Sequence, residues 1–391
     1  MQKTKNSESK MQTIRDDKDR IYDYMLAMVP GVGDVTISAL MDAFGSAKEV
    51  FKANEKQLSD VNGISKKKCS EIIRTKNAEE EIRQKISRWN RDGIKAVFIH
   101  EQAYPKKLRN LADAPFAFFY KGSLPIGAAP TVAIVGSRAC TEYGKNVAFS
   151  FGKRLALEGV QIISGMAAGA DVYGHKGALS AGGYTAGVLG CGVDICYPRT
   201  NFNVYMEMQK TGGIMSEVIP GTAPAPGLFP RRNRLIAALS DAVIITEARL
   251  KSGSLITADQ ALEQGKDVFA VPGRIGDPLS MGCIELIRQG AYPLTCVDDI
   301  LSSEAVKRKI KPCNSEACKG QDSSDHSTDD ENVYAKKVLK TLTDIPKNIN
   351  RIMYEASLGY EVTAQSLLEL ELQGMLRSVS AGLYVRAEVA V

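Results

Sequence analysis

The chain has 391 residues, of which 44% are hydrophobic and 24% are charged, which is the composition of an ordinary globular protein. This length exceeds what one hydrophobic core usually organises, so we expect two or three domains. No apolar run reaches the length of a membrane span, and we expect none. The net charge of +5 is too small to identify a partner, so the positions of the basic residues are more informative than their sum.

Residues 1–20 are charged throughout and lack the apolar segment of a secretory signal. They predict a disordered tail and a cytoplasmic protein. In that compartment the eight cysteines should be reduced thiols. Their spacing, with only three histidines in the chain, does not match a zinc site, so we expect no metal.

Residues 21–95 have a helical pattern with two short glycine turns, at residues 29–33 and 61–64. Glycine there lets the backbone approach a phosphate, and the helix that follows offers free N–H groups to it. This pattern predicts a helix-hairpin-helix, or SAM-like, domain. Three lysines follow the second turn at residues 66–68, but such turns also serve as corners between packed helices, so contact with DNA and plain packing both stay open.

Residues 96–303 alternate apolar strands with helical segments, which predicts an α/β domain with a Rossmann-like, doubly wound, mostly parallel sheet. Most strands are continuous apolar runs, as expected where helices cover both faces. The predicted strands are residues 131–136, 160–165, 184–190, 213–218, 241–248 and 267–273. The predicted helices between them include residues 146–158 and 254–264.

The last part of the chain predicts a linker and a third small domain. Residues 304–331 are polar, poor in aromatic residues, and change from basic to acidic, which is typical of a flexible linker. Residues 332–391 contain helical segments and then the run AGLYV at residues 381–385, which suggests a short hairpin or strand. Helices closed by such a strand predict a winged-helix-like domain.

The first predicted strand ends in a turn that suits a phosphate. Ligands of open α/β sheets bind at the carboxyl ends of the strands, and this end carries Gly136, Ser137 and Arg138 before a helix. Glycine permits the tight turn, and arginine adds a permanent charge beside the helix N–H groups. The dinucleotide signature GxGxxG is absent from this turn, and GxxxxGK[ST] is absent from the chain, so we expect no nucleotide cofactor.

The segment FPRRNR at residues 229–234 places Arg231, Arg232, Asn233 and Arg234 at the start of a predicted helix. Arginines there oppose the helix dipole, an arrangement that favours a bound polyanion over a solvated face. Residues 164–165 and 252–254 add two more turns rich in glycine and hydroxyl groups at strand ends. One mononucleotide would not need so many turns along one edge, whereas a strand of nucleic acid would.

These segments also resemble, in order, the motifs of the DprA/Smf (DNA-processing protein A) family. The likeness covers about residues 100–300 and includes the runs VAIVGSR, SGMAAGAD, LGCGVDICYP, FPRRNRLIAALS and SGSLITADQALEQGKDVFAVPG. The resemblance implies single-stranded DNA binding, protection of incoming strands, loading of a RecA-type recombinase and homodimerisation in natural transformation. With the nucleotide signatures missing, we expect a protein that is not an enzyme and has no cofactor.

Carried over by position, the resemblance implies that Arg138 and residues 232–234 contact DNA, with Arg231 adding charge and Arg199 extending the groove. Neither Arg138 nor Arg232 is expected to pack in the core. The chain departs from the family at Ala168, where the family often has arginine. The expected DNA-binding residues are Gly136, Ser137, Arg138, Ser164, Gly165, Arg199, Arg231, Arg232, Asn233, Arg234, Ser252, Gly253 and Ser254.

The alternative is a nucleotide phosphoribohydrolase of the lysine-decarboxylase-like superfamily, which shares this type of sheet. Those enzymes resemble one another in a PGGxGTxxE loop whose glutamate does the chemistry. Gln260 stands at the glutamate position here and cannot exchange a proton as a carboxylate does. Asp259 would point to another side of the helix, and a single histidine such as His175 is more often structural. We therefore prefer the DNA-binding interpretation.

Overall fold

The computed structural model describes residues 19–309, 329–342, 347–356, 358–372, 375–380 and 383–386. Two compact units divide the chain, Met1–Ile310 and Lys311–Val391. Nearly all of the expected N-terminal tail, and the expected linker from residue 310 to 328, lie outside the described residues. Among the residues that are described, no helix is long and apolar enough to cross a membrane.

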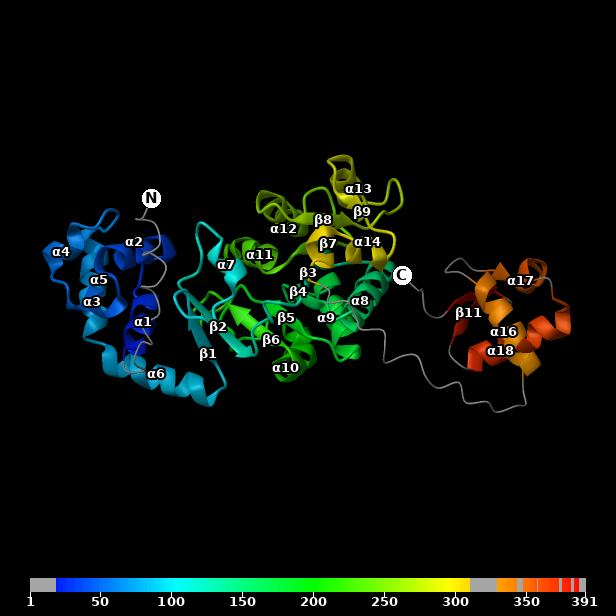
Figure 1. Ribbon diagram of the computed structural model, residues 1–391, viewed down its shortest axis with the longest axis horizontal. Coiled ribbons are helices and arrows are strands. Elements are labelled where there is room, and N and C mark those ends of the chain that lie inside the picture. Colours follow the sequence, from blue (N-terminus) through cyan, green and yellow to red (C-terminus); the bar gives the residue numbers. More distant parts are fainter. Residues whose placement is uncertain are drawn as a thin grey trace, which may run out of the picture. The chain divides into compact units, whose positions relative to one another are not determined.

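A helical domain opens the first unit (Figure 1), as the sequence predicts. Its helices are α1 (Arg20–Ala27), α2 (Asp34–Phe44), α3 (Ala47–Lys52), α4 (Glu55–Ser59), α5 (Lys66–Lys76) and α6 (Glu79–Arg91). Both predicted glycine turns fall between helices. Gly31 and Gly63 have φ values of 74° and 81°, a left-handed conformation that glycine adopts without strain.

The central domain is built on a nine-stranded sheet of order β1-β2-β6-β5-β4-β3-β7-β8-β9. Its strands are β1 (Lys95–Phe98), β2 (Ala117–Gly122), β3 (Thr131–Val135), β4 (Gln161–Ser164), β5 (Thr185–Val188), β6 (Gly213–Ser216), β7 (Ala242–Ile245), β8 (Asp267–Ala270) and β9 (Tyr292–Pro293). Strands β3 to β9 are mutually parallel, whereas β1 and β2 are antiparallel additions. The structure confirms all six predicted strands. The sequence missed β1, β2 and β9, which are short or partly exposed.

The order of the strands decides where the sheet has its crevice. From β3 the chain moves outward through β4 and β5 to β6, then returns to β7 on the other side of β3. The helices of the outward path therefore lie on one face of the sheet and those of the return path on the other. The switch point lies between β3 and β7, where ligands of doubly wound sheets bind.

Helices cover both faces of this sheet (Figure 1). They are α7 (Lys106–Arg109), α8 (Glu142–Leu157), α9 (Ala170–Ser180), α10 (Phe202–Thr211), α11 (Leu228–Leu239), α12 (Gly253–Glu263), α13 (Met281–Arg288), α14 (Val297–Leu301) and α15 (Glu304–Lys307). Helices α8, α9 and α10 pack on the strands of the outward path, and α12 packs on β7 and β8. Strand residues such as Ile134, Ile163 and Ile244 are fully buried, so the predicted Rossmann-like fold is confirmed.

The expected boundary between the sheet domain and the linker, at residue 304, is wrong. Residues 304–307 form α15, and Val306 is fully buried. Lys309 Nζ lies 2.7 Å from Asp241 Oδ1, next to the start of β7. The folded part of the first unit therefore extends to at least residue 309. Two small apolar residues, Ala305 and Val306, in a strongly charged run gave too little signal to predict this.

The second unit combines helices with a three-stranded antiparallel sheet of order β10-β12-β11. Its elements are α16 (Asp329–Thr341), β10 (Lys347–Asn348), α17 (Ile349–Ala356), α18 (Tyr360–Leu372), β11 (Leu376–Ser380) and β12 (Leu383–Arg386). Val338, Ile352 and Leu367 belong to its core. The strand expected near residues 381–385 is present as β12, while residues 381 and 382 lie outside the described part. The winged-helix-like assignment stays a prediction.

Candidate nucleic-acid interface

The turn after β3 is fixed against the end of β7, beside the switch point. Ser137 N donates a hydrogen bond to Glu247 O at 2.8 Å. A Cβ atom on Gly136 would lie 2.4 Å from Thr246 Oγ1, so only glycine fits there. This packing leaves the next residue, Arg138, exposed at the carboxyl edge of the sheet.

Glu247 is a buried carboxylate that the sequence patterns do not single out. It accepts hydrogen bonds from Thr141 N at 2.8 Å and from Thr141 Oγ1 at 2.5 Å. The Thr141 hydroxyl in turn accepts from Gly144 N and so caps the start of α8. A Cβ atom on Gly144 would lie 2.5 Å from the Glu247 carboxylate, so glycine is required at this contact. Glu247 therefore holds the segment that follows Arg138 against β7.

Arg138 lies beside the aromatic ring of Phe229 at this edge, and Phe229 in turn lies beside Tyr197. Its guanidinium carbon is 5.6 Å from the centroid of the Phe229 ring, and the Phe229 and Tyr197 rings are 5.5 Å apart at 32°. Tyr197 is 43% exposed. No carboxylate among the described residues pairs with Arg138. An available cation next to a pair of aromatic rings, one of them exposed, is a combination that suits the phosphates and bases of single-stranded nucleic acid.

Arg199 extends this group along the chain. It is exposed, two residues after Tyr197, in a short 3-10 turn, Arg199–Asn201, that leads into α10. The sequence predicted Arg138 and Arg199 as site residues but did not reveal the two aromatic rings, although both stand beside basic residues in the motifs described above. An aromatic residue beside a basic run was the signal that could have found them.

Arg232, in contrast, lies in the interior, and the expectation that it stays out of the core is wrong. It is 5% exposed. Its Nη1 donates to Gly165 O at 2.6 Å and also to Val188 O, so the guanidinium joins the carboxyl ends of β4 and β5. Burial lowers the pKa of Arg232 to about 10, which still leaves it charged at neutral pH. From the interior of the domain, Arg232 thus holds the ends of β4 and β5 together at this edge.

The other two arginines of the cluster are held by carboxylates. Arg231 is half exposed and lies 3.0 Å from Asp34 Oδ2 and 3.1 Å from Glu217 Oε1. Arg234 is buried, with its Nη2 on Glu217 and its Nε 3.0 Å from Asp113 Oδ2. Burial raises the pKa of Glu217, and the two arginines partly offset that shift. The sequence pattern favoured a bound polyanion over a solvated face and did not reveal these acidic partners, of which Asp34 and Asp113 lie far away in the chain.

Several other predicted site residues also support the edge from inside. Ser164 is fully buried and donates to Ile134 O at 2.5 Å. Gly165 is buried too, and its amide donates to Asp171 Oδ2 at 3.1 Å. Asn233 Nδ2 donates to Gly253 O at 3.2 Å, which ties α11 to the turn before α12. These contacts fix the end of β4 against β3, order the loop after β4, and tie α11 to the loop after β7.

The turn at residues 252–254 is partly accessible. Ser252 Oγ and Ser254 Oγ are 2.5 Å apart, with Ser254 buried and Gly253 exposed. Ser252 and Gly253 line a hollow of about 520 Å³ between α12 and α13, together with Leu250 and Ile256. The predicted DNA-binding residues therefore divide into an accessible set around Arg138 and a buried set that holds the surrounding loops in place.

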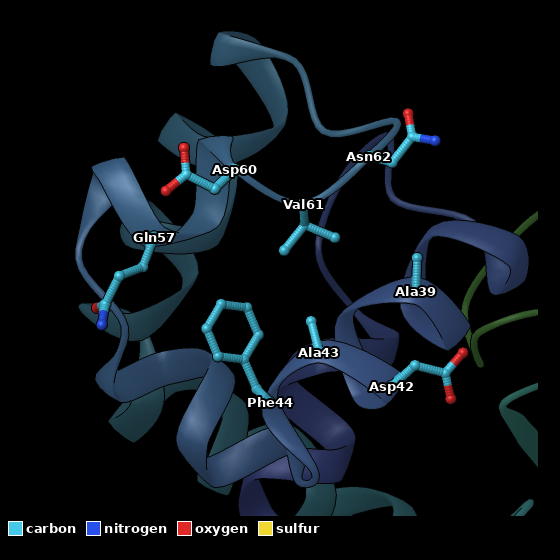
Figure 2. Close-up of a pocket in the computed structure, with 8 residues that line it drawn as sticks. All are labelled: Ala39, Asp42, Ala43, Phe44, Gln57, Asp60, Val61 and Asn62. Carbon is cyan, nitrogen blue, oxygen red and sulfur yellow. The ribbon is translucent and has the colours of Figure 1, made fainter.

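A second hollow, of about 690 Å³, lies in the helical domain and not at this edge. Figure 2 shows Phe44, Ala43 and Val61 around its centre and the carboxylates of Asp42 and Asp60 at its sides. The remaining lining residues are Ala39, Gln57 and Asn62. Carboxylates repel phosphates, so this hollow does not suit a nucleic-acid backbone.

The groups named for the enzymatic alternative make structural contacts. Burial, with a smaller effect of the Arg232 charge, lowers the pKa of His175 to about 3, and its Nδ1 lies 2.6 Å from Thr185 Oγ1. His175 has no exposed surface. Gln260 Nε2 donates to Glu263 Oε2 at 2.9 Å. Across the described residues, no group of three or more His, Cys, Asp or Glu side chains is placed to hold a metal ion.

The chain is similar in sequence and in fold to several known proteins. Residues 95–305 match the family model for DNA recombination-mediator protein A, and residues 23–75 match the model for SAM-like helix-hairpin-helix tandems. The DNA processing protein DprA of Streptococcus pneumoniae is 44% identical over 204 residues, which are 52% of this chain and 72% of that protein. DprA of Bacillus subtilis is 40% identical over 241 residues, 60% of this chain and 81% of that protein. The X-ray structure of S. pneumoniae DprA superposes with a TM-score of 0.64 and 32% identity, covering 74% of this chain and 99% of that one.

Proposed function

Because the chain belongs to the DNA recombination-mediator protein A family, we propose that it binds single-stranded DNA at the carboxyl edge of its central sheet and transfers the strand to a RecA-type recombinase. The observation that carries this proposal is the position of Arg138 against the half-buried ring of Phe229, which in turn lies beside the exposed ring of Tyr197. A nucleic-acid strand alternates charged phosphates with flat bases, and this edge offers a cation and rings side by side.

In this proposal Arg138 and Arg199 hold phosphates, while the rings stack on bases. Stacking is tolerant of sequence because every base has an aromatic face, so binding should show little sequence preference. Ser137 and the turn at Ser252 and Gly253 would add hydroxyl and backbone contacts at the same edge. The DNA contacts expected for Arg232, Asn233, Arg234, Ser164 and Gly165 become indirect, because these side chains and backbone groups hold the loops that carry the exposed residues.

The partners of the proposed function follow from the family resemblance. We propose a cytoplasmic homodimer that protects incoming strands and loads the recombinase during DNA uptake. Co-purification of the protein with RecA, compared with and without single-stranded DNA, tests the recombinase step separately from DNA binding. DNA binding without any co-purification of RecA, in the presence or absence of the single strand, would contradict that step alone.

The DNA-binding step is tested by titrating a labelled oligonucleotide, with duplex DNA and mononucleotides as competitors. We expect a preference for the single strand, and an affinity that falls with salt at a log–log slope of about −0.7 for each phosphate neutralised. Arg138→Ala should weaken DNA binding by about 1–3 kcal/mol. The salt dependence should become shallower by about 0.7, the contribution of one phosphate contact, and the melting temperature should not change. Equal affinity for duplex DNA, or a salt-independent constant, would contradict the proposal.

A further inference from the structure

Helix α10 begins with an exposed aromatic side chain that no function above explains. Phe202 is 53% exposed, and Met206, one turn further along the same helix, is 42% exposed. The side chains of α10 that face the sheet, Val204, Tyr205 and Met208, are buried. The core therefore does not need Phe202, which lies outside it.

The start of α10 is tied to the carboxyl edge of the sheet. Asn201 Nδ2 donates to Met166 O at 2.9 Å and to Ala167 O at 3.3 Å. Met166 and Ala167 belong to the loop after β4, which begins at Gly165, the residue held by Arg232. Because Asn201 immediately precedes Phe202, the exposed ring is placed at the same edge as Arg138.

The ring of Phe202 also has a rigid support. Its centroid is 6.4 Å from that of Tyr205, and the two planes differ by 24°. Tyr205 is 4% exposed, and its hydroxyl donates to Val193 O at 2.6 Å. A ring that is held on one side by a fixed neighbour and is half exposed loses little conformational entropy when a flat partner stacks on it.

The segment from Tyr197 to Met206 has the charge pattern of a track for single-stranded DNA. Arg199 is its single charged residue, and the segment contains no carboxylate. Along the chain, the ring of Tyr197 is followed by the cation of Arg199 and then by the ring of Phe202. This order extends the group of Arg138, Phe229 and Tyr197 at the candidate interface by one cation and one ring.

We propose that Phe202 is an additional base-stacking position, so that a bound DNA strand continues from Tyr197 past Arg199 onto α10. The inference rests on the proposed function, since it assigns a further nucleotide to the same bound strand. The bound DNA strand would then lie on two adjacent parts of the protein surface. The first part extends from Arg138 to Tyr197, and the second consists of Phe202 and Met206. Only an oligonucleotide long enough to cover both parts would contact Phe202.

The test compares Phe202→Ala with the wild type, both as full-length proteins, on oligonucleotides of increasing length. We expect wild-type affinity for the shortest oligonucleotides that bind, and a loss of about five- to a hundredfold for longer ones, the effect of losing one stacked base. Leu157→Ala is the matched control, because Leu157 is 65% exposed at the far end of α8. Wild-type affinity of Phe202→Ala at every length would overturn the proposal.

A spectroscopic variant separates stacking from a structural role. Phe202→Trp should keep the affinity for long oligonucleotides, and stacking of a base should quench the fluorescence of the introduced indole. The wild-type protein, with its single tryptophan Trp89, supplies the baseline. Quenching by long but not by short oligonucleotides is expected. An indole that is not quenched while DNA binds would show that the strand takes another path.

Two further outcomes are distinguishable. If the wild-type protein binds no oligonucleotide of any length, the proposed function itself fails, and this inference fails with it. If Phe202→Ala leaves DNA binding intact but changes the sedimentation of the protein, the exposed face of α10 is a contact between protein chains, and the base-stacking assignment is overturned.

Discussion

At the scale of single residues, Arg138 and Arg232 show how one residue type serves two purposes at one edge. Both were expected to contact DNA directly. Arg138 is exposed beside Phe229 and is available to a phosphate. Arg232 is buried, and its guanidinium is used by Gly165 O and Val188 O. A buried cation is tolerated only where hydrogen bonds replace its hydration, and the two carbonyl oxygens supply them.

This difference predicts that Arg232→Ala destabilises the protein. The substitution leaves two buried carbonyl groups without a partner, and we expect the free energy of unfolding to fall by about 2–4 kcal/mol, measured by urea denaturation. Arg231→Ala is the matched control and should cost less than about 1 kcal/mol, because Arg231 is half exposed and Glu217 keeps Arg234. If Arg232→Ala unfolded like the wild type but no longer bound DNA, Arg232 would be a direct ligand after all.

At the scale of elements, Asp241 connects parts of the fold that are far apart in the sequence. It accepts from Thr131 N at 2.9 Å at the start of β3, and Lys107 Nζ of α7 lies 2.8 Å from the same carboxylate. Lys309, after α15, completes the group. Burial alone would raise the pKa of Asp241, but the two lysines outweigh burial and hold that pKa below its usual value.

The sign of this shift gives a pH prediction. A carboxyl whose folded pKa is depressed contributes stability above its unfolded pKa, and this contribution is lost as the pH falls through the folded pKa. We therefore expect Asp241→Asn to lower the free energy of unfolding by about 1–3 kcal/mol at pH 7, and the difference from the wild type to shrink in acid. Urea denaturation over a pH series measures it. Asp267→Asn, at the start of β8, serves as the control, and a difference independent of pH would contradict the assignment.

At the scale of the whole molecule, the sheet domain and its helical partner form one unit that ends near residue 310. Val306 and Lys309 belong to this unit through burial and through the Asp241 carboxylate. The proposed DNA-binding edge lies entirely within it. The second unit has its own core around Val338 and Ile352.

These boundaries predict the behaviour of two shortened chains. A chain that ends at Ile310 should keep the stability of the first unit and bind single-stranded DNA like the full-length protein. A chain that ends at Ser303 lacks Val306 and Lys309, and its melting temperature should be lower. Thermal melting and oligonucleotide titration of both chains provide the test. If the chain that ends at Ile310 stayed folded but no longer bound DNA, the principal site would lie in the second unit.

The sequence by itself determined the six strands β3 to β8 and helices such as α8 and α12, because those signals are local. Continuous apolar runs such as residues 242–245 are typical of buried strands, and the turn glycines Gly31 and Gly63 mark the ends of helices in the N-terminal domain. Ligands of open α/β sheets bind at the carboxyl ends of the strands, so these local patterns are also sufficient to place Arg138 at a binding edge.

Only the tertiary structure decided which of the clustered arginines reach that edge. The burial of Arg232 and Arg234 depends on Gly165, Val188 and Glu217, which come from other strands and loops. Likewise, Tyr197 and Phe229 meet only because the chain crosses the sheet between them. A local pattern can state that a charge needs a partner, but the identity of that partner is set by contacts between residues distant in sequence, and these exist only once the chain has folded.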